Sequence, residues 1–223
     1  MMSQDDITVV VPTLNEEHAI GVVIDELRQA GYRNILVVDG YSTDGTFQIA
    51  QEKGVAAFRQ EGIGKAGAIR TGIKHAETPY IVFIDADYTY DPRDIERLHH
   101  QAGRYDQIIG TRVDRQNIPK LHRVGNKIIN LAFNLVMGTR VTDICSGMYL
   151  VRKGSARKLN LSTKGFDVEV EIVAQILAVG GKIIEVPIHY RKRIGAKKLQ
   201  TWKAGLRILI TTLSLFRYRK SRV

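Results

Sequence analysis

The chain alternates short, continuously apolar runs with helical patterns, and this alternation restricts its fold more than any other feature. The apolar runs are ITVVVPT (7–13), NILVVD (34–39), VAAFRQ (55–60) and YIVFIDAD (80–87). Because consecutive positions are apolar, these runs are typical of strands covered on both faces. Strand–helix alternation of this kind predicts an α/β fold with a mainly parallel sheet flanked by helices.

The pattern loosens beyond residue 110 but gives no sign of an independent second domain. An amphipathic segment (121–138), a short strand (146–153), a helix (168–181) and a final strand (182–191) are expected there. With 223 residues the chain is long enough for one sizeable core. We expect residues 1–199 to form one α/β domain and residues 200–223 to form a basic amphipathic helix.

Composition restricts the cellular setting. Cys145 is the single cysteine, which rules out a disulfide framework and fits a reducing compartment. The acidic start MMSQDDITVV lacks the basic residues of an export signal. The longest apolar candidate, ILITTLSLF (208–216), is far shorter than the roughly 20 residues that span a bilayer. We therefore expect a cytoplasmic chain that does not cross a membrane by itself.

The net charge of +10 is concentrated near the C-terminus. No acidic residue occurs in 188–223, whereas the basic residues there are Arg191, Lys192, Arg193, Lys197, Lys198, Lys203, Arg207, Arg217, Arg219, Lys220 and Arg222. Such a block indicates an anionic partner: nucleic acid, a phosphorylated ligand or a membrane surface. The sequence contains no aromatic-interleaved patch or motif of a nucleic-acid-binding module.

Two aspartates, Asp85 and Asp87, end the apolar run at 80–87. In an extended segment these side chains would share a face, where their like charges repel unless a cation lies between them. Their hard oxygen ligands suit Mg²⁺ or Mn²⁺, which would bridge a diphosphate to the protein. A structural turn is the alternative interpretation.

Three further motifs follow predicted strands, where parallel sheets gather their ligands. In PTLNEE (12–17), Asn15 and Glu16 begin a helix whose amide-rich end attracts anions, or simply cap it. In VVDGYSTDGT (37–46), Asp39 suits a hydrogen bond to a base or ribose, although a plain loop–helix junction fits equally. In GIGKAGAIRTG (62–72), Lys65 suits a phosphate, but P-loop spacing is absent, which argues against an ATPase.

Together these motifs resemble glycosyltransferase family 2, the inverting enzymes of the GT-A fold, and within it the polyprenyl-phosphate sugar synthases. The resemblance runs from Ile7 to Leu199. Its later parts are GTR (110–112), HRVGN (122–126), TDICSGMYLVRK (142–153), GFDVEVEI (165–172) and EVPIHYRKRIGAKKL (185–199).

The resemblance implies roles for matching positions. A nucleoside pocket would be lined by Pro12, Asn15, Glu16 and Asp39. A metal on Asp85 and Asp87 would hold the diphosphate. The acceptor phosphate would meet Arg112 and Arg123, and a closing loop would place Arg193 and Lys198 over the diphosphate.

The implied reaction moves a hexose, with inversion, from a UDP- or GDP-linked sugar to a polyprenyl phosphate. An ionised phosphate needs no general base, and arginine matches its geometry. A hydroxyl acceptor is the alternative, with Asp167 or Glu169 as base, although either residue fits the charged face of an amphipathic helix. A sugar nucleotidyltransferase is a more distant alternative.

The C-terminal stretch has apolar residues at helical spacing between basic ones. The apolar positions are Trp202, Leu206, Leu209, Ile210, Leu213 and Phe216. This pattern predicts a helix in the interface of a membrane, which would make the protein peripheral at its cytoplasmic face. Packing on the chain's own core, or on a membrane partner subunit, remains open. Residues 121–137 are expected to add a second apolar surface.

Overall fold

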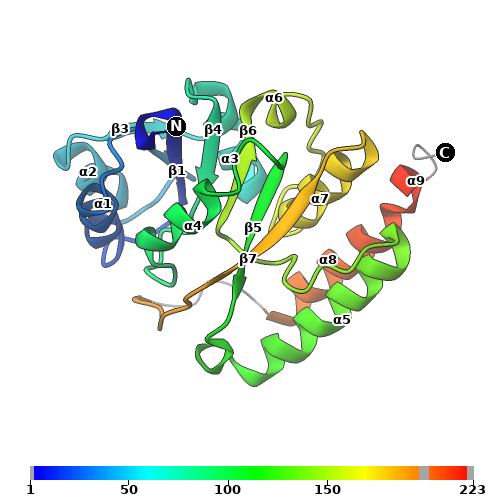
Figure 1. The fold of residues 1–223 in the computed structure, drawn as a ribbon. Coiled ribbons are helices and arrows are strands. Elements are labelled where there is room, and N and C mark those ends of the chain that lie inside the picture. The colour runs from blue at the N-terminus through cyan, green and yellow to red at the C-terminus, as the bar shows by residue number, and fades with distance from the viewer. Residues whose placement is uncertain (1–2, 196–200, 220–223) are drawn as a thin grey trace.

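A seven-stranded sheet forms the centre of the molecule (Figure 1). The computed structural model describes residues 3–195 and 201–219. Sheet order is β3-β2-β1-β4-β6-β5-β7, and only β6 runs antiparallel to its neighbours. The strands are β1 Ile7–Thr13, β2 Ile35–Asp39, β3 Ala56–Arg59, β4 Tyr80–Phe83, β5 Gln107–Arg112, β6 Tyr149–Arg152 and β7 Ile183–Ile188. The predicted mainly parallel α/β sheet is confirmed.

Helices cover both faces of this sheet. They are α1 Ile20–Gln29, α2 Thr46–Glu52, α3 Gly64–His75, α4 Ile95–His99, α5 Lys120–Met137, α6 Lys153–Ala156, α7 Val168–Ala178, α8 Thr201–Ser214 and α9 Phe216–Arg219. One core joins the sheet to α1, α2 and α4, and a second joins it to α3, α6 and α7. Alternate residues of β1 enter the two cores, Val9 the first and Val10 the second, which explains why the run is apolar throughout.

A third core lies beside the sheet, where α5, α7 and α8 meet. Phe133 of α5, Val173 of α7 and Ile208 of α8 are buried together there with Ile109 of β5. The C-terminal helix therefore packs on the chain's own core through one side. No helix in the described residues is both long and apolar enough to cross a membrane.

The structure corrects three local expectations. The run at 55–60 is not covered on both faces, because β3 is the edge strand and its side chains are mostly exposed. Strand β4 ends at Phe83, so Asp85 and Asp87 lie in the turn that follows and not in an extended segment. The first helix begins at Ile20 and not near Asn15, whose φ of 49° is left-handed.

Candidate active site

The loops that follow β1, β2 and β4 lie next to one another at the carboxyl edge of the sheet. Thr13 of β1 is in register with Asp39 of β2, and Ile84 N donates to Val10 O (3.1 Å) just after β4. Parallel neighbours end at the same edge, so the motifs predicted from separate parts of the sequence are brought together.

Lys65 of α3 joins two carboxylates in this region. Its Nζ lies 2.7 Å from Asp85 Oδ1 and 2.6 Å from Glu169 Oε1. Burial lowers the pKa of Lys65, but the two carboxylates outweigh it and hold that pKa well above its usual range. Burial raises the pKa of Glu169, and Lys65 opposes the rise. Lys65, which we expected to meet a phosphate, is thus ion-paired with both Asp85 and Glu169.

Arg193 provides a second cation, for Asp87. Its Nη1 forms an ion pair with Asp87 Oδ2, and its Nη2 lies 2.5 Å from Glu16 Oε1. Thr89 donates to Asp87 Oδ1 from both its amide (3.1 Å) and its hydroxyl (2.5 Å). Burial and the nearby charge of Asp85 raise the pKa of Asp87. The two neighbouring aspartates are therefore each held by a different cation.

Gly147, at the entry to β6, makes room for Asp85. A Cβ on this glycine would lie 2.0 Å from Asp85 Oδ2 and 2.5 Å from its Cγ. Its amide donates to the buried Tyr90 hydroxyl (2.7 Å), which fixes the backbone at that distance. Gly147 belongs to the motif TDICSGMYLVRK (142–153), but the spacing of that motif alone does not reveal which carboxylate the glycine faces.

Asp39 and Asn15 shape the loop after β2. Asp39 is fully buried, accepts from Ser42 N (2.9 Å) and Oγ (2.5 Å), and pairs with Arg59. Asn15 N donates to Ser42 Oγ (2.7 Å), and its Oδ1 accepts from Thr43 N (2.7 Å). Both side chains thus order the backbone of this loop. Pro12, in register with Val38, lies at the end of β1 in the same region.

Asp143 relates the two arginines assigned to an acceptor, because it pairs with Arg112 and lines a cavity together with Arg123. Arg112 is buried and holds Asp143 with two side-chain bonds, Nε–Oδ2 at 2.7 Å and Nη2–Oδ1 at 2.5 Å. Asp143 also lines a cavity of about 390 Å³ whose wall on α5 includes Lys120, Arg123 and Lys127. The structure therefore brings both arginines to one region. Lys198 lies outside the described residues.

Asp167 and Glu169 do not form the charged face of an amphipathic helix, so this alternative to a role as base is wrong. Helix α7 is buried on nearly all sides, and both residues are buried with it. Asp167 accepts from Gly165 N (3.1 Å) and Thr211 Oγ1 (2.8 Å). Glu169 is paired with Lys65.

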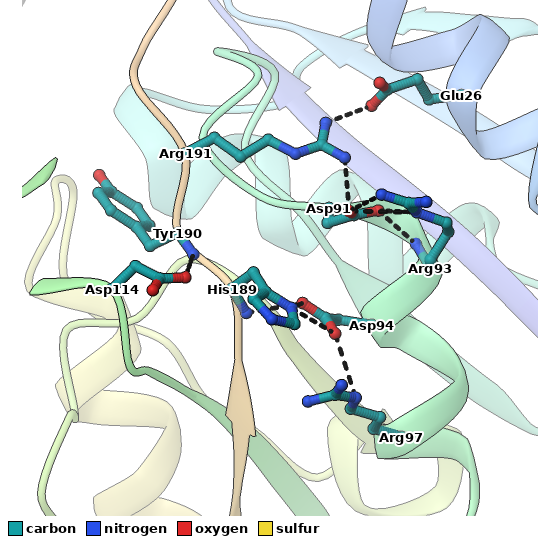
Figure 2. Close-up of polar contacts among 9 residues, drawn as sticks. All are labelled: Glu26, Asp91, Arg93, Asp94, Arg97, Asp114, His189, Tyr190 and Arg191. Atoms are coloured by element: carbon teal, nitrogen blue, oxygen red, sulfur yellow. Dashed lines mark hydrogen bonds and ion pairs between the residues drawn. The ribbon is translucent and has the colours of Figure 1, made fainter.

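The segment after β7 is anchored through Arg191 (Figure 2). Arg191 Nη1 lies 2.7 Å from Glu26 Oε2, and Nη2 lies 2.6 Å from Asp91 Oδ2. Its amide donates to Thr89 O (2.7 Å), and Ile194 N donates to Asp87 O (3.1 Å). This anchor was not predicted from the sequence; it holds the chain so that Arg193 reaches Asp87.

The donor set at this edge fits a metal shared with a phosphorylated ligand better than a metal held by protein alone. In residues 3–195 and 201–219, no three His, Cys, Asp or Glu side chains form a group able to hold a metal. Asp85 and Asp87 offer two carboxylates, and Mg²⁺ is commonly bound by one or two carboxylates together with substrate phosphates and water.

Comparison with known proteins identifies relatives across most of the chain. The sequence pattern described as "Glycosyl transferase family 2" matches residues 8–159. Glycosyltransferase AglJ of Haloferax volcanii is 35% identical over 198 residues, which are 86% of this chain and 65% of AglJ. A dolichyl-phosphate hexose transferase of the same organism is 31% identical over 212 residues, which are 92% of this chain and 91% of that transferase.

The fold is shared with a solved glycosyltransferase structure. Glucosyl-3-phosphoglycerate synthase from Mycobacterium tuberculosis, in complex with Mn²⁺, UDP-glucose and glycerol 3-phosphate, superposes with a TM-score of 0.79. The match covers 95% of this chain and 80% of that one at 21% identity. The expected GT-A fold is confirmed.

Proposed function

Since the chain belongs to glycosyltransferase family 2, we propose that it transfers a hexose, with inversion, from a UDP- or GDP-linked sugar to a polyprenyl phosphate. The observation that carries this proposal is the meeting of two parts at one sheet edge. Asp85 and Asp87 lie there with their cations, and Arg112 and Asp143 connect that edge to the basic cavity of α5. The dolichyl-phosphate hexose transferase among the relatives supports the choice of acceptor.

Asp85 and Asp87 would hold Mg²⁺ or Mn²⁺, as suggested by the Mn²⁺ and UDP-glucose in the complex of the structural relative. When bound, the cation would compensate the charge of the nucleotide diphosphate. Lys65 and Arg193 hold the two carboxylates in place, and Arg193 adds positive charge next to the departing group. Pro12, Asn15, Glu16 and Asp39 would form and support the nucleoside side of the site, and Lys198 would close it.

On the acceptor side, an ionised phosphate needs orientation and charge compensation instead of a base. Arg123, Lys120 and Lys127 supply positive charge around the α5 cavity. Arg112 fixes Asp143 at the wall of that cavity through a bidentate pair. Both candidate bases for a hydroxyl acceptor are buried and engaged, Glu169 with Lys65 and Asp167 with Gly165 N and Thr211 Oγ1, which favours the phosphate acceptor. Because a polyprenyl chain is membrane-bound, the enzyme would act at a membrane surface; a membrane partner subunit stays a prediction.

A matched acceptor panel tests this function. The purified chain is incubated with UDP-glucose, UDP-N-acetylglucosamine or GDP-mannose, with Mn²⁺ or Mg²⁺. Each donor is paired with a short polyprenyl phosphate, the corresponding alcohol, or 3-phosphoglycerate. We expect a β-linked glycolipid from one donor and the phosphate acceptor only, and no product with EDTA or with Asp87→Ala. Product from the alcohol or phosphoglycerate alone would contradict the proposal.

A further inference from the structure

Helix α5 exposes a stripe of large aliphatic side chains to solvent. Its members are spaced three and four residues apart, and each is more than half exposed: Leu121, Val124, Ile128, Leu131 and Leu135. The opposite side of the helix buries Ile129, Phe133 and Met137 in the third core. The helix is thus apolar on both sides, whereas a surface helix that only packs on its own domain is polar outside.

Helices α8 and α9 extend this apolar surface. Leu206, Ile210, Leu213 and Phe216 are at least half exposed, while Ile208 and Leu215 enter the third core. Figure 1 shows α5 and α8 side by side, and the two helices are in contact. Because both bury their inner sides in the same core, their exposed stripes face outward together. We call these nine exposed residues the α5/α8 face; large aliphatic and aromatic side chains exposed together on two packed helices mark an interaction surface.

The segments that carry the α5/α8 face have charged residues of a single sign. No Asp or Glu occurs in residues 115–142 or 186–223. Exposed basic side chains flank the face: Lys120, Lys127, Arg140, Lys203 and Arg207. An apolar face with basic flanks matches the headgroup region of an anionic bilayer.

We propose that the α5/α8 face docks on an anionic lipid bilayer. A second copy of the chain is the competing occupant, because spacing of three and four residues is also that of a coiled-coil seam. However, an isologous pairing would bring the basic flanks of one copy against those of the other, with no acidic residues on these helices to pair with them. The charge pattern therefore favours lipid.

Docking of this face would place the α5 cavity at headgroup level. Val124 belongs to the face and also lines the cavity, together with Lys120, Arg123 and Lys127. A lipid-borne phosphate at the membrane surface would then lie beside the cavity without leaving the bilayer. Only this last step rests on the proposed function, since the docking surface itself follows from exposure and charge.

Flotation of the whole chain with vesicles tests the docking without donor or acceptor. Vesicles of phosphatidylcholine alone are compared with vesicles that also contain phosphatidylglycerol. We expect about tenfold or greater preference for the anionic vesicles, and a loss of about tenfold or more with the double variant Leu131→Glu, Ile210→Glu. Val22→Glu changes an exposed aliphatic residue of α1, away from the face, and should bind as the unchanged chain does.

Folding and self-association are measured on the same variants. Thermal unfolding should show that the Leu131→Glu, Ile210→Glu variant remains folded. A second variant, Lys127→Gln with Arg207→Gln, keeps every apolar residue and removes two basic ones. Its binding to anionic vesicles should also fall. An unchanged chain that ignores anionic vesicles would overturn the proposal. So would full binding by the folded double variant, or a lipid-free dimer that Leu131→Glu dissociates. Vesicle binding is scored separately from sugar transfer, so a negative acceptor panel would not be mistaken for failure here.

Discussion

Arg193 forms an ion pair with Asp87, although 106 residues separate them in the chain. The same guanidinium reaches Glu16 on the loop after β1 (2.5 Å). One side chain from the segment after β7 therefore joins two strand ends of the candidate active site. Its planar fork suits such a double contact, which a lysine would not reproduce.

Replacing Arg193 should impair turnover more than folding. We expect Arg193→Ala to lower kcat by about 10²–10³, because a fixed donor next to the departing diphosphate is removed. Arg97→Ala is the matched control, since Arg97 is half exposed and pairs with Asp94 away from the site. Steady-state kinetics with the best donor measure both variants. Unchanged kcat in Arg193→Ala would refute its role.

Gly147→Ala should displace Asp85. The new methyl group would lie 2.0 Å from a carboxylate oxygen, so the carboxylate must move or the backbone must shift. We expect the metal concentration for half-maximal activity to rise about tenfold or more, as for other losses of ligand support. Gly154→Ala, where an added Cβ meets nothing within 4 Å, should leave that value unchanged. Equal metal dependence of both variants would contradict this account.

Arg191 should act as a positioning residue for Arg193. Its clasp on Glu26 and Asp91 holds the segment that follows β7 (Figure 2). Arg191→Gln is expected to raise the donor KM about tenfold, with partial recovery in Arg191→Lys because a lysine keeps the charge but not the fork. Arg93 also pairs with Asp91 but is mostly exposed, so Arg93→Gln should change little. A fall in unfolding temperature with unchanged KM would instead show a purely structural role.

Arg123→Ala should separate acceptor use from donor use. With a short polyprenyl phosphate in solution, we expect the acceptor KM to rise about tenfold to a hundredfold, as a charge-assisted hydrogen bond is lost. The donor KM should stay within about twofold, because Arg123 lies on α5 at the basic cavity. An equal rise in the donor KM and the acceptor KM would show that this cavity does not distinguish the two substrates.

Cys145 should resist alkylation in the folded protein. Cys145 is partly buried, and this burial raises the pKa of its thiol to about 12, which disfavours the thiolate at neutral pH. In the unfolded chain the pKa returns to about 8.5, and thiolate accumulates from pH 8 upward. We therefore expect iodoacetamide to react far more slowly with the native protein than with the urea-unfolded chain at pH 8. Equal rates would show that the thiol is not shielded.

The sheet was predictable because its central strands are buried on both faces and therefore read as uninterrupted apolar runs. The exposure of β3 could not be predicted, because an edge position depends on the order of the strands and not on the composition of one run. The reversal of β6 was equally hidden, because a single short strand carries no mark of its direction.

Much of the candidate site follows from the same rule that gathers strand ends at one edge. Asp39 was correctly predicted to end a strand, and Asp85 and Asp87 to lie at a carboxyl end, although these two follow β4 in a turn and are not part of the strand. The partners of these acids were not predicted, because Lys65–Glu169 and Arg193–Glu16 join residues that are distant in sequence. Chemistry at a strand end can be anticipated, whereas the cation that meets it depends on the folded arrangement.

The reversed direction of β6 has a consequence for how this enzyme can diversify. Strand β5 leaves the sheet at Arg112, and β6 re-enters at Tyr149 on the same edge. The whole excursion between them, α5 included, thus departs from the site and comes back to it. Under the proposed function, α5 could be lengthened or rebuilt to admit a different acceptor, provided that the returning segment at Gly147, which abuts Asp85, keeps its shape.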